Sequence, residues 1–298
     1  MCLWSDSLFR RGYYKLLLGY VRHTPLRFKR VGVYTKLIEP GLKRRPILVV
    51  ARTRFGRFHC DTQDVIQRYL YAFGIWEPRV TEFIHSRLKP GDAFLDVGAN
   101  IGYYSILASR LVGPSGSVVA VEPSPSIRRE LLLNIDLNGA DNVRVVSAAA
   151  SDKRGEAVIY RAGNANRGSS SLLASRGYAE ESVVQTLPLS DVLSELEFSS
   201  CRLIKVDVEG HEMHVLDGLI PLLASSRPDL KIVIEISGRE LELEGASVDT
   251  LFKKMGALGF LPYLIENDYH PHRYIANDFA LKVSRLCEIG RASCRERV

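Results

Sequence analysis

The 298-residue chain lacks several features that would assign it to a membrane or a cysteine-based class. It has no apolar run close to the ~20 residues that a membrane-spanning helix needs. Its five cysteines are scattered and form no CxxC pair, which argues against a disulfide scaffold and against a zinc site. With 46% hydrophobic and 25% charged residues, the composition also excludes a wholly disordered or fibrous chain.

Two further observations concern the ends of the chain. No basic, apolar and small-residue segments follow one another in the order of a secretory signal, so we expect a cytoplasmic protein. At the other end, residues 288–298 read EIGRASCRERV. This string resembles the translation of a sequencing adapter, so we interpret it as an artefact and leave it out of the fold and site predictions.

Charge is distributed unevenly along the chain. Residues 1–60 contain 14 Lys and Arg but only Asp6 and Glu39 as acids, a balance of +12, whereas the remaining residues hold 26 Lys and Arg against 32 acids, a balance of −6. The first 60 residues therefore form a basic extension. It is either a solvated face or a contact with an anionic membrane, an acidic substrate or nucleic acid. Because the body is acidic, we expect no nucleic-acid partner, and a peripheral membrane contact is the alternative location.

The hydrophobic pattern changes along the chain. Weak helical patterning covers residues 9–21, two apolar runs around a glycine turn predict a hairpin over residues 47–60, and helical spacing covers residues 64–71 and 77–88. From residue 93 onward, short apolar strands alternate with helices, which predicts a doubly wound, mostly parallel α/β sheet. The predicted strands are residues 93–97, 117–121, 143–149, 203–208, 231–236, 260–265 and 279–283; the predicted helices are residues 101–112, 125–138, 213–223 and 248–258.

An insertion, residues 152–200, separates the third and fourth predicted strands. Its centre, residues 163–171, reads GNANRGSSS and is polar throughout. A loop of this length is either a mobile surface segment or a lid that contacts the acceptor substrate.

The first strand ends in a glycine-containing turn, residues 94–105, which reads FLDVGANIGYYS. Such turns lie at the carboxyl edge of the sheet, where α/β folds bind their ligands. Gly98 and Gly102 permit a tight turn and close approach of a ligand. A dinucleotide fingerprint needs glycine where this chain has Asn100 and Tyr103, and a P-loop lysine is absent, so NAD and ATP sites are disfavoured.

Two acids accompany this turn. Glu122 ends the second strand, 24 residues after Gly98, where a carboxylate accepts hydrogen bonds from the two ribose hydroxyls of a nucleoside. Asp96 adds a second carboxylate that suits a cationic amino group. Together the turn and the two acids predict a nucleoside-containing cofactor.

A second acidic motif, residues 204–212, reads IKVDVEGHE. Asp207 and Glu209 alternate by two, so we expect them to share one face at the end of the strand. Paired carboxylates supply a general base or a clamp for a substrate. His211 is the other candidate base, although it and His214 are also interpretable as helix-surface residues, and Glu235 ends the fifth strand at the same edge. The spacing does not demand a metal, and we predict none.

At these motifs the chain resembles the FkbM-type methyltransferases of the class I, S-adenosyl-L-methionine-dependent superfamily. The resemblance covers about residues 60–284 and rests on DVGANIG at 96–102, VEP at 121–123, AAASD at 148–152, GSSSL at 168–172 and KVDVEG at 205–210. It implies a Rossmann-like sheet of seven strands, a methyltransferase domain over residues 61–287 after the basic extension, and O-methylation of a hydroxyl on a glycan, polyketide or other secondary metabolite.

The resemblance also implies roles for individual residues. Glu122 would hold the cofactor's ribose, the segment around Ala149 and Ser151 would line its adenine, and the first turn would cradle its methionine part through Asp96, Gly98, Ala99, Asn100 and Gly102. We rank Asp207 first as the base and His211 second, with Glu209 and Glu235 orienting the acceptor. An RNA methyltransferase, a nicotinamide-dependent sugar oxidoreductase and a non-enzymatic binding module are the alternatives, because a fold alone does not decide function.

Overall fold

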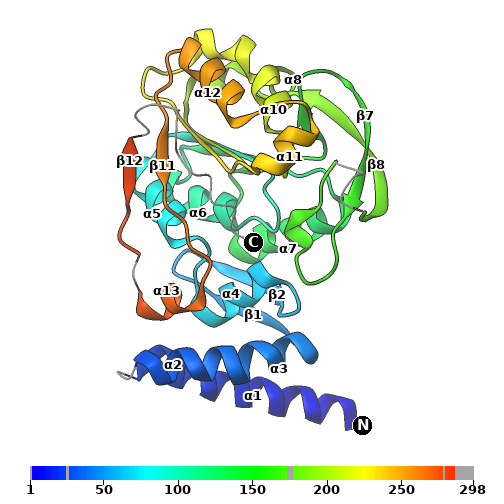
Figure 1. The fold of residues 1–298 in the computed structure, drawn as a ribbon, viewed down its shortest axis with the longest axis vertical. Coiled ribbons are helices and arrows are strands. Elements are labelled where there is room, and N and C mark those ends of the chain that lie inside the picture. Colours follow the sequence, from blue (N-terminus) through cyan, green and yellow to red (C-terminus); the bar gives the residue numbers. More distant parts are fainter. Residues whose placement is uncertain (1, 25–26, 173–176, 278, 286–298) are drawn as a thin grey trace. The chain divides into compact units, whose positions relative to one another are not determined.

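The computed structural model describes residues 2–24, 27–172, 177–277 and 279–285 (Figure 1). Its internal contacts group the chain into two compact units. The first holds Met1–Phe83, Gly163–Gly168 and Asn267–Leu281, and the second holds Ile84–Ala162, Ser169–Glu266 and Lys282–Val298. Residues 288–298, interpreted above as an artefact, lie outside the described residues.

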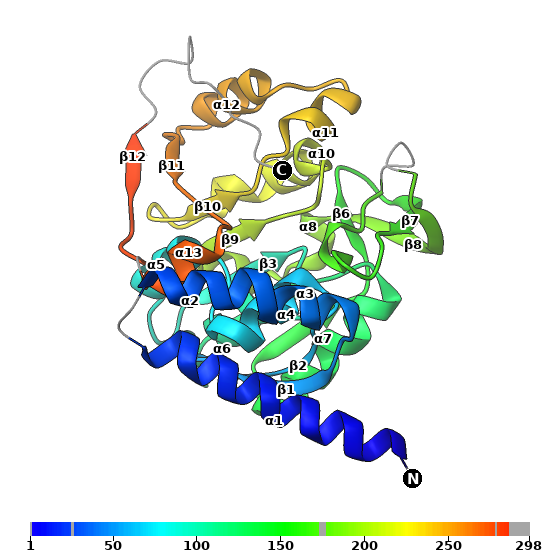
Figure 2. The same cartoon turned by 60° about the horizontal axis from the view of Figure 1, so that its bottom comes forward.

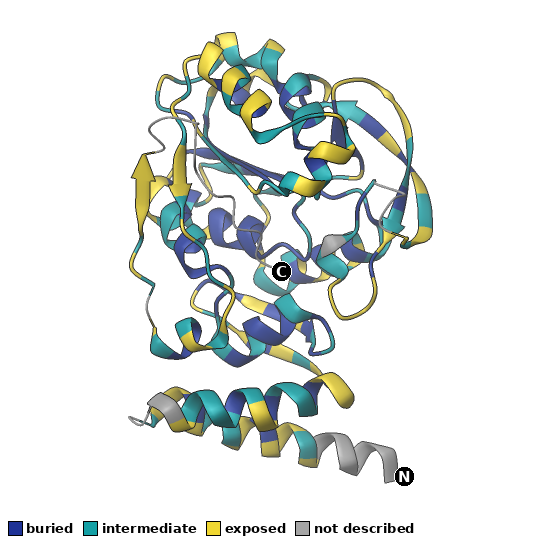
Figure 3. Ribbon diagram, viewed as in Figure 1, coloured by how far each residue is buried: buried dark blue, intermediate teal, exposed yellow. Residues whose placement is uncertain are grey.

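The second unit is built on a parallel sheet of five strands in the order β10-β9-β3-β4-β5. Figure 3 shows the central strands as mostly buried. The mostly parallel α/β fold predicted from the sequence is therefore confirmed, and the predicted strands 93–97 and 117–121 agree with the structure residue for residue. The strands are β3 (Ala93–Val97), β4 (Ser117–Val121), β5 (Val143–Val146), β9 (Cys201–Val206) and β10 (Lys231–Ile234).

The strands bury alternate side chains on the two faces of this sheet. Leu95, Val97 and Ile204 belong to the main core, with Leu216 and Leu219 of the helix α10, and Ala120 packs on the other face against Leu131 of α7. The helices of this unit are α6 (Tyr103–Val112), α7 (Pro125–Asn138), α8 (Leu189–Val192), α9 (Glu195–Ser199), α10 (Glu212–Leu219), α11 (Gly238–Leu243) and α12 (Val248–Ala257), with a 3-10 helix over Ile220–Ser225; α5 (Pro78–Arg87) spans the boundary between the units.

The prediction of seven strands is wrong, because the parallel sheet formed by the described residues has five. The predicted strand 260–265 ends in β11 (Tyr263–Ile265), and the predicted strand 279–283 overlaps β12 (Val283–Arg285) at Val283 alone. β11 and β12 form a separate antiparallel pair. Tyr263 is 54% exposed and Val283 is 40% exposed, so these strands lack the buried faces that a central parallel sheet requires. The predicted strand 143–149 also divides, since β5 ends at Val146 and β6 (Ala149–Ser151) joins another sheet.

The insertion folds mainly as a second sheet in the order β6-β8-β7. Its two long strands, β7 (Gly155–Arg161) and β8 (Ala179–Pro188), run antiparallel, and β6 runs parallel to β8. At the centre of the insertion, residues 163–168 group with the first unit. There the Arg167 amide donates a hydrogen bond to Asp64. Whether this loop contacts an acceptor stays a prediction.

The basic extension is mostly helical. The buried side chains Tyr14, Leu18, Val21, Tyr34 and Ile38 form the centre of its core, and the predicted hairpin is confirmed by the antiparallel pairing of β1 and β2. Figure 2 shows these elements from below. They are α1 (Cys2–His23), α2 (Arg27–Val33), a π-helix (Tyr34–Ile38), α3 (Glu39–Arg44), β1 (Leu48–Arg52) and β2 (Arg57–Asp61). Beyond the extension, the first unit adds α4 (Val65–Phe73) and α13 (Pro271–Ala276). No described helix is both long enough and apolar enough to span a bilayer.

Candidate functional site

The turn between β3 and α6 has the tight geometry that its glycines predict. Gly98 has a φ of +82°, and a Cβ atom there would lie 1.8 Å from the backbone oxygen of Asp207. Gly102 has a φ of +88°, and its Cβ would lie 2.5 Å from a methyl carbon of Leu131. Only glycine fits these two positions. The turn thus brings the backbone of Asn100 and its neighbours to the carboxyl edge of the sheet.

Glu122, which follows β4, is fixed against this turn. One carboxylate oxygen accepts a hydrogen bond from the Asn100 amide at 2.9 Å, and the other accepts one from the Ser124 amide at 2.9 Å. The side chain is buried, and burial raises its pKa to about 7. The predicted ribose acid and the predicted turn therefore form one hydrogen-bonded unit, although they are distant in sequence.

Asp96 lies in the last part of β3 and is 1% exposed. Its Oδ2 accepts a hydrogen bond from the Ser105 hydroxyl at 2.6 Å, whereas its Oδ1 has no hydrogen-bond partner among the described residues. Burial raises the pKa of this carboxyl group, an effect that the nearby Lys205 ammonium opposes. A buried, unpartnered carboxylate oxygen is costly, so a cationic donor on a ligand fits this position.

Lys205 is a site residue that the sequence analysis did not single out. It is 3% exposed, and its Nζ lies 2.8 Å from a carboxylate oxygen of Asp207 and 5.0 Å from the ring centroid of Tyr104. In the register of β3 and β9 it is paired with Asp96. The available signal was a single lysine inside an apolar strand, two residues before an aspartate.

The strand alternation expected for Asp207 and Glu209 does not extend that far. Strand β9 ends at Val206, and Glu209 has a left-handed backbone with a φ of +55°. The Glu209 carbonyl accepts a hydrogen bond from Ser171. Glu235 directly follows β10, is exposed, and donates its amide to the Val206 carbonyl. The three acids therefore lie in the segments that follow two neighbouring strands, Asp207 and Glu209 after β9 and Glu235 after β10. They do not share one face of a strand, contrary to the sequence prediction for Asp207 and Glu209.

His211 stands at the N-cap of α10. Its Nε2 lies 3.1 Å from the hydroxyl oxygen of Ser151, a buried residue of β6 next to the equally buried Ala149 and Ala150. Burial, together with the neighbouring His214, lowers the pKa of His211 to about 4, so its imidazole is neutral at pH 7. The structure thus brings a predicted catalytic residue into contact with a predicted adenine-lining residue.

Glu212 is a second residue that the sequence analysis did not assign. It is 1% exposed; its Oε1 accepts a hydrogen bond from the Gly210 amide at 2.9 Å, and its Oε2 has no hydrogen-bond partner among the described residues. Burial raises its pKa to about 7. An acid in the first turn of a helix is a common sequence feature, and for that reason its sequence context gave no distinguishing signal.

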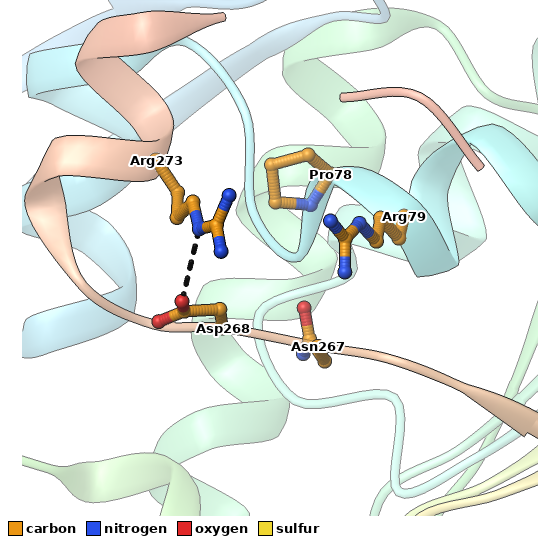
Figure 4. Close-up of a pocket in the computed structure, with 5 residues that line it drawn as sticks. All are labelled: Pro78, Arg79, Asn267, Asp268 and Arg273. Atoms are coloured by element: carbon orange, nitrogen blue, oxygen red, sulfur yellow. Dashed lines mark hydrogen bonds and ion pairs between the residues drawn. The ribbon is translucent and has the colours of Figure 1, made fainter. Parts of the chain in front are cut away.

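A pocket in the first unit contains none of these residues. It is lined by Pro78, Arg79, Asn267, Asp268 and Arg273 (Figure 4). Inside it, Arg273 forms an ion pair with Asp268 at 3.1 Å. The lining of this pocket therefore includes neither the glycines of the β3–α6 turn nor the acids Asp96, Glu122 and Asp207.

Comparison with known proteins identifies the family. Residues 96–262, more than half of the chain, match the Methyltransferase FkbM domain. The chain belongs to the FkbM methyltransferase family. The match begins at Asp96 and includes Glu122, Lys205 and Asp207, so it covers the turn and both acidic motifs described above. The resemblance inferred from the sequence is confirmed.

Three curated relatives are similar to parts of this family member. AMB antimetabolite synthetase AmbE of Pseudomonas aeruginosa is 30% identical over 86% of this chain and 14% of its own length. Hexuronic acid methyltransferase AglP of Haloferax volcanii is 25% identical over 63% of this chain and 74% of its own. The 31-O-demethyl-FK506 methyltransferase FkbM of Streptomyces tacrolimicus is 32% identical over 44% of this chain and 61% of its own.

The chain thus spans 14% of AmbE and less than two thirds of the Streptomyces enzyme. Among solved structures, the methyltransferase FkbM from Methylobacillus flagellatus KT is 15% identical with a TM-score of 0.41, over 79% of this chain and 56% of that one.

Proposed function

We propose that this FkbM family member is an S-adenosyl-L-methionine-dependent methyltransferase that methylates a hydroxyl group. The observation that carries the proposal is the hydrogen-bonded unit of the β3–α6 turn and Glu122, beside the buried and unpartnered Oδ1 of Asp96. The family match over residues 96–262 supports it independently.

The residues at this edge fit the chemistry of that cofactor. Glu122 has free lone pairs on both carboxylate oxygens, which suit two ribose hydroxyl donors. The Asp96 carboxylate suits the ammonium group of the methionine part, and the bare backbone at Gly98 and Gly102 leaves room for close approach. Ala149 and Ser151 would line the adenine. When bound, the cofactor supplies a methyl group activated on a sulfonium sulfur.

The acceptor hydroxyl must lose its proton as the methyl group is transferred. We assign this proton to the Asp207 carboxylate, which follows β9 at the same edge and is 29% exposed. Lys205 is a positioning residue in this scheme, because its ammonium group at 2.8 Å fixes one Asp207 oxygen and leaves the other available. Glu209 and Glu235 would orient the acceptor.

The acceptor class rests on the relatives. The names of AglP and of the Streptomyces FkbM enzyme give a hexuronic acid and 31-O-demethyl-FK506 as what those proteins methylate. We therefore propose a hydroxyl on a glycan, a polyketide or another secondary metabolite. An RNA acceptor is the alternative, because the Lys and Arg residues of the basic extension suit a phosphate backbone.

Calorimetric titration of the full chain with S-adenosylmethionine, its demethylated product, NAD and a generic RNA tests this proposal. We expect micromolar affinity for the first two ligands and a large loss in Glu122→Ala, because the ribose hydrogen bonds disappear. Glu156→Ala is the matched control, since Glu156 is an exposed acid on β7. Tight binding of NAD, or unchanged cofactor affinity in Glu122→Ala, would overturn the assignment.

A further inference from the structure

Two histidines and a glutamate lie together in the second unit. His211 is the N-cap residue of α10, His214 lies in its first turn, and Glu244 is the C-cap residue of α11. One possible ligand atom from each of the three residues lies within 4.8 Å of the other two. The two imidazole rings are stacked with centroids 4.3 Å apart and planes 21° apart.

The far side of each imidazole is already engaged. His211 Nε2 lies 3.1 Å from the Ser151 hydroxyl oxygen, and His214 Nδ1 lies 3.3 Å from a carboxylate oxygen of Asp152. Hydrogen bonds of this kind fix the tautomer of a metal-binding histidine and direct its other nitrogen to the metal. They leave Nδ1 of His211 and Nε2 of His214 as the ligand atoms, and His214 Nε2 lies 3.3 Å from Glu244.

We propose that His211, His214 and Glu244 bind a zinc ion, with Ser151 and Asp152 as the hydrogen-bond partners that orient the two imidazoles. Two histidines and a glutamate are an established zinc ligand set that leaves one position open for water. In a tetrahedral site with zinc–ligand distances of ~2.0–2.2 Å the ligand atoms lie about 3.4 Å apart. The three ligand atoms must therefore draw together, and the stacked imidazoles must turn until their nitrogen lone pairs point to one centre. His214 and Glu244 have room for this movement, since their side chains are 36% and 25% exposed.

This site departs from the sequence analysis, which predicts no metal. The residues that form it are separated by up to about ninety positions, from Asp152 to Glu244, and no short spacing in the sequence indicates them. The competing interpretation is a contact without metal, in which the His214 imidazole bridges Asp152 and Glu244 directly. The two interpretations differ in whether the protein takes up zinc. The zinc site does not depend on the proposed methyl transfer.

Calorimetric titration of tag-free, chelator-treated full-length protein with zinc chloride tests the proposal in the absence of any cofactor. We expect one zinc ion per chain and much weaker binding of Mg²⁺, which prefers oxygen ligands. Asp152→Asn should weaken zinc binding by ~10–100-fold, the usual effect of losing such a partner. His214→Ala and Glu244→Gln should weaken it further, because each removes a ligand.

His270→Ala is the matched control. His270 belongs to another stacked histidine pair, with His272, whose ring centroids lie 5.6 Å apart in the first unit, so its loss should leave the zinc affinity unchanged. Circular dichroism and melting temperatures establish that each variant is folded, and zinc should raise the melting temperature of the parent protein but not of His214→Ala. Zinc affinity unchanged in His214→Ala and Glu244→Gln, or no zinc uptake by the parent protein, would overturn the proposal.

Discussion

Lys205 pairs with Asp207 at 2.8 Å and stands opposite Asp96 in the register of β3 and β9. One buried ammonium group thus serves two acids with different assignments, Asp96 on the cofactor side and Asp207 on the acceptor side. Removing a charged partner from a buried site leaves the other charge uncompensated. Lys205 therefore couples the stability of the second unit to the arrangement of the candidate site.

Replacing Lys205 by methionine tests this coupling. Because Asp96 is 1% exposed and loses its nearby cation, we expect Lys205→Met to lower the free energy of unfolding at pH 7 by ~3 kcal/mol, the lower end for breaking a buried pair. Burial already raises the Asp96 pKa, so protonation at lower pH should restore part of the loss. Urea denaturation at pH 5 and pH 8 measures both effects. Equal stability of variant and parent at pH 8 would contradict the coupling.

Asp207→Asn separates proton acceptance from structure. Asparagine keeps the size of the side chain but takes up no proton, so we expect single-turnover methyl transfer to fall by ~10²–10⁴. Cofactor affinity should change little, since our proposal places the cofactor against Glu122 and the β3–α6 turn rather than against Asp207. Asp141→Asn, at an exposed acid, is the control. If Asp207→Asn folds normally and transfers methyl groups at the parent rate, Asp207 is not the base.

The pKa of Glu122 predicts how cofactor affinity depends on pH. Burial raises this pKa to about 7 in the protein alone. In the proposed complex the ribose hydroxyls donate to the ionised carboxylate, so binding should favour the deprotonated form. Affinity should be highest above pH 7 and fall by up to about ten-fold per pH unit below it. Titration calorimetry between pH 5.5 and pH 8.5 measures the slope. Glu122→Gln should bind weakly with a flatter profile; an equally steep profile would assign the dependence to another group.

Much of the geometry around the β3–α6 turn could be predicted from the sequence because it is local. Apolar runs bounded by a Pro-Gly pair and by a glycine turn define β3, and Ser124 caps α7 by accepting a hydrogen bond from the Ile127 amide. Gly98 and Glu122 follow directly from the ends of two such strands. These features depend on neighbours within a few residues.

The remaining features depend on contacts between distant residues. The contact of His211 with Ser151 spans 60 positions, and the burial of Lys205 is set by β3 and Tyr104. The sixth and seventh strands failed for a different reason: short apolar runs at residues 260–265 and 279–283 look like buried strands in sequence, but Tyr263 and Val283 are exposed. The periodicity of a short apolar run does not show whether its residues are buried in the core of the folded protein.

Gly98→Ala tests the close approach of the turn to β9. Its Cβ would lie 1.8 Å from the Asp207 backbone oxygen, so the turn must move, and we expect loss of cofactor binding together with a clear drop in melting temperature. Gly139→Ala is the matched control, because Gly139 also has a positive φ, +58°, but no atom within 4 Å of the added carbon. It should cost only the ~1–2 kcal/mol of left-handed strain. If Gly98→Ala and Gly139→Ala lower the melting temperature and the cofactor affinity by similar amounts, the close contact between Gly98 and Asp207 does not explain the effect.

The outer face of α1 presents a feature that the charge pattern alone did not specify. Phe9, Tyr13, Leu16 and Tyr20 are separated by four, three and four positions, which places them on one side of a helix. All four are exposed, Phe9 and Leu16 at 78% each, while Tyr14, Leu18 and Val21 fill the opposite, buried face. From this surface, together with the balance of +12 over residues 1–60, we propose an anionic membrane as the partner of the extension.

Vesicle sedimentation tests that surface. We expect the full chain to bind vesicles of phosphatidylcholine with phosphatidylglycerol and not vesicles of phosphatidylcholine alone, since each Lys or Arg near an anionic surface contributes about 1 kcal/mol. Added salt should weaken binding through screening. Leu16→Ser should weaken it through lost apolar burial, whereas Leu196→Ser, at an equally exposed leucine (77%) on α9, should not. A second copy of the chain is the other occupant that such a face suits. Light scattering that shows a dimer broken by Leu16→Ser, with no vesicle binding by the parent protein, would replace the membrane with that copy.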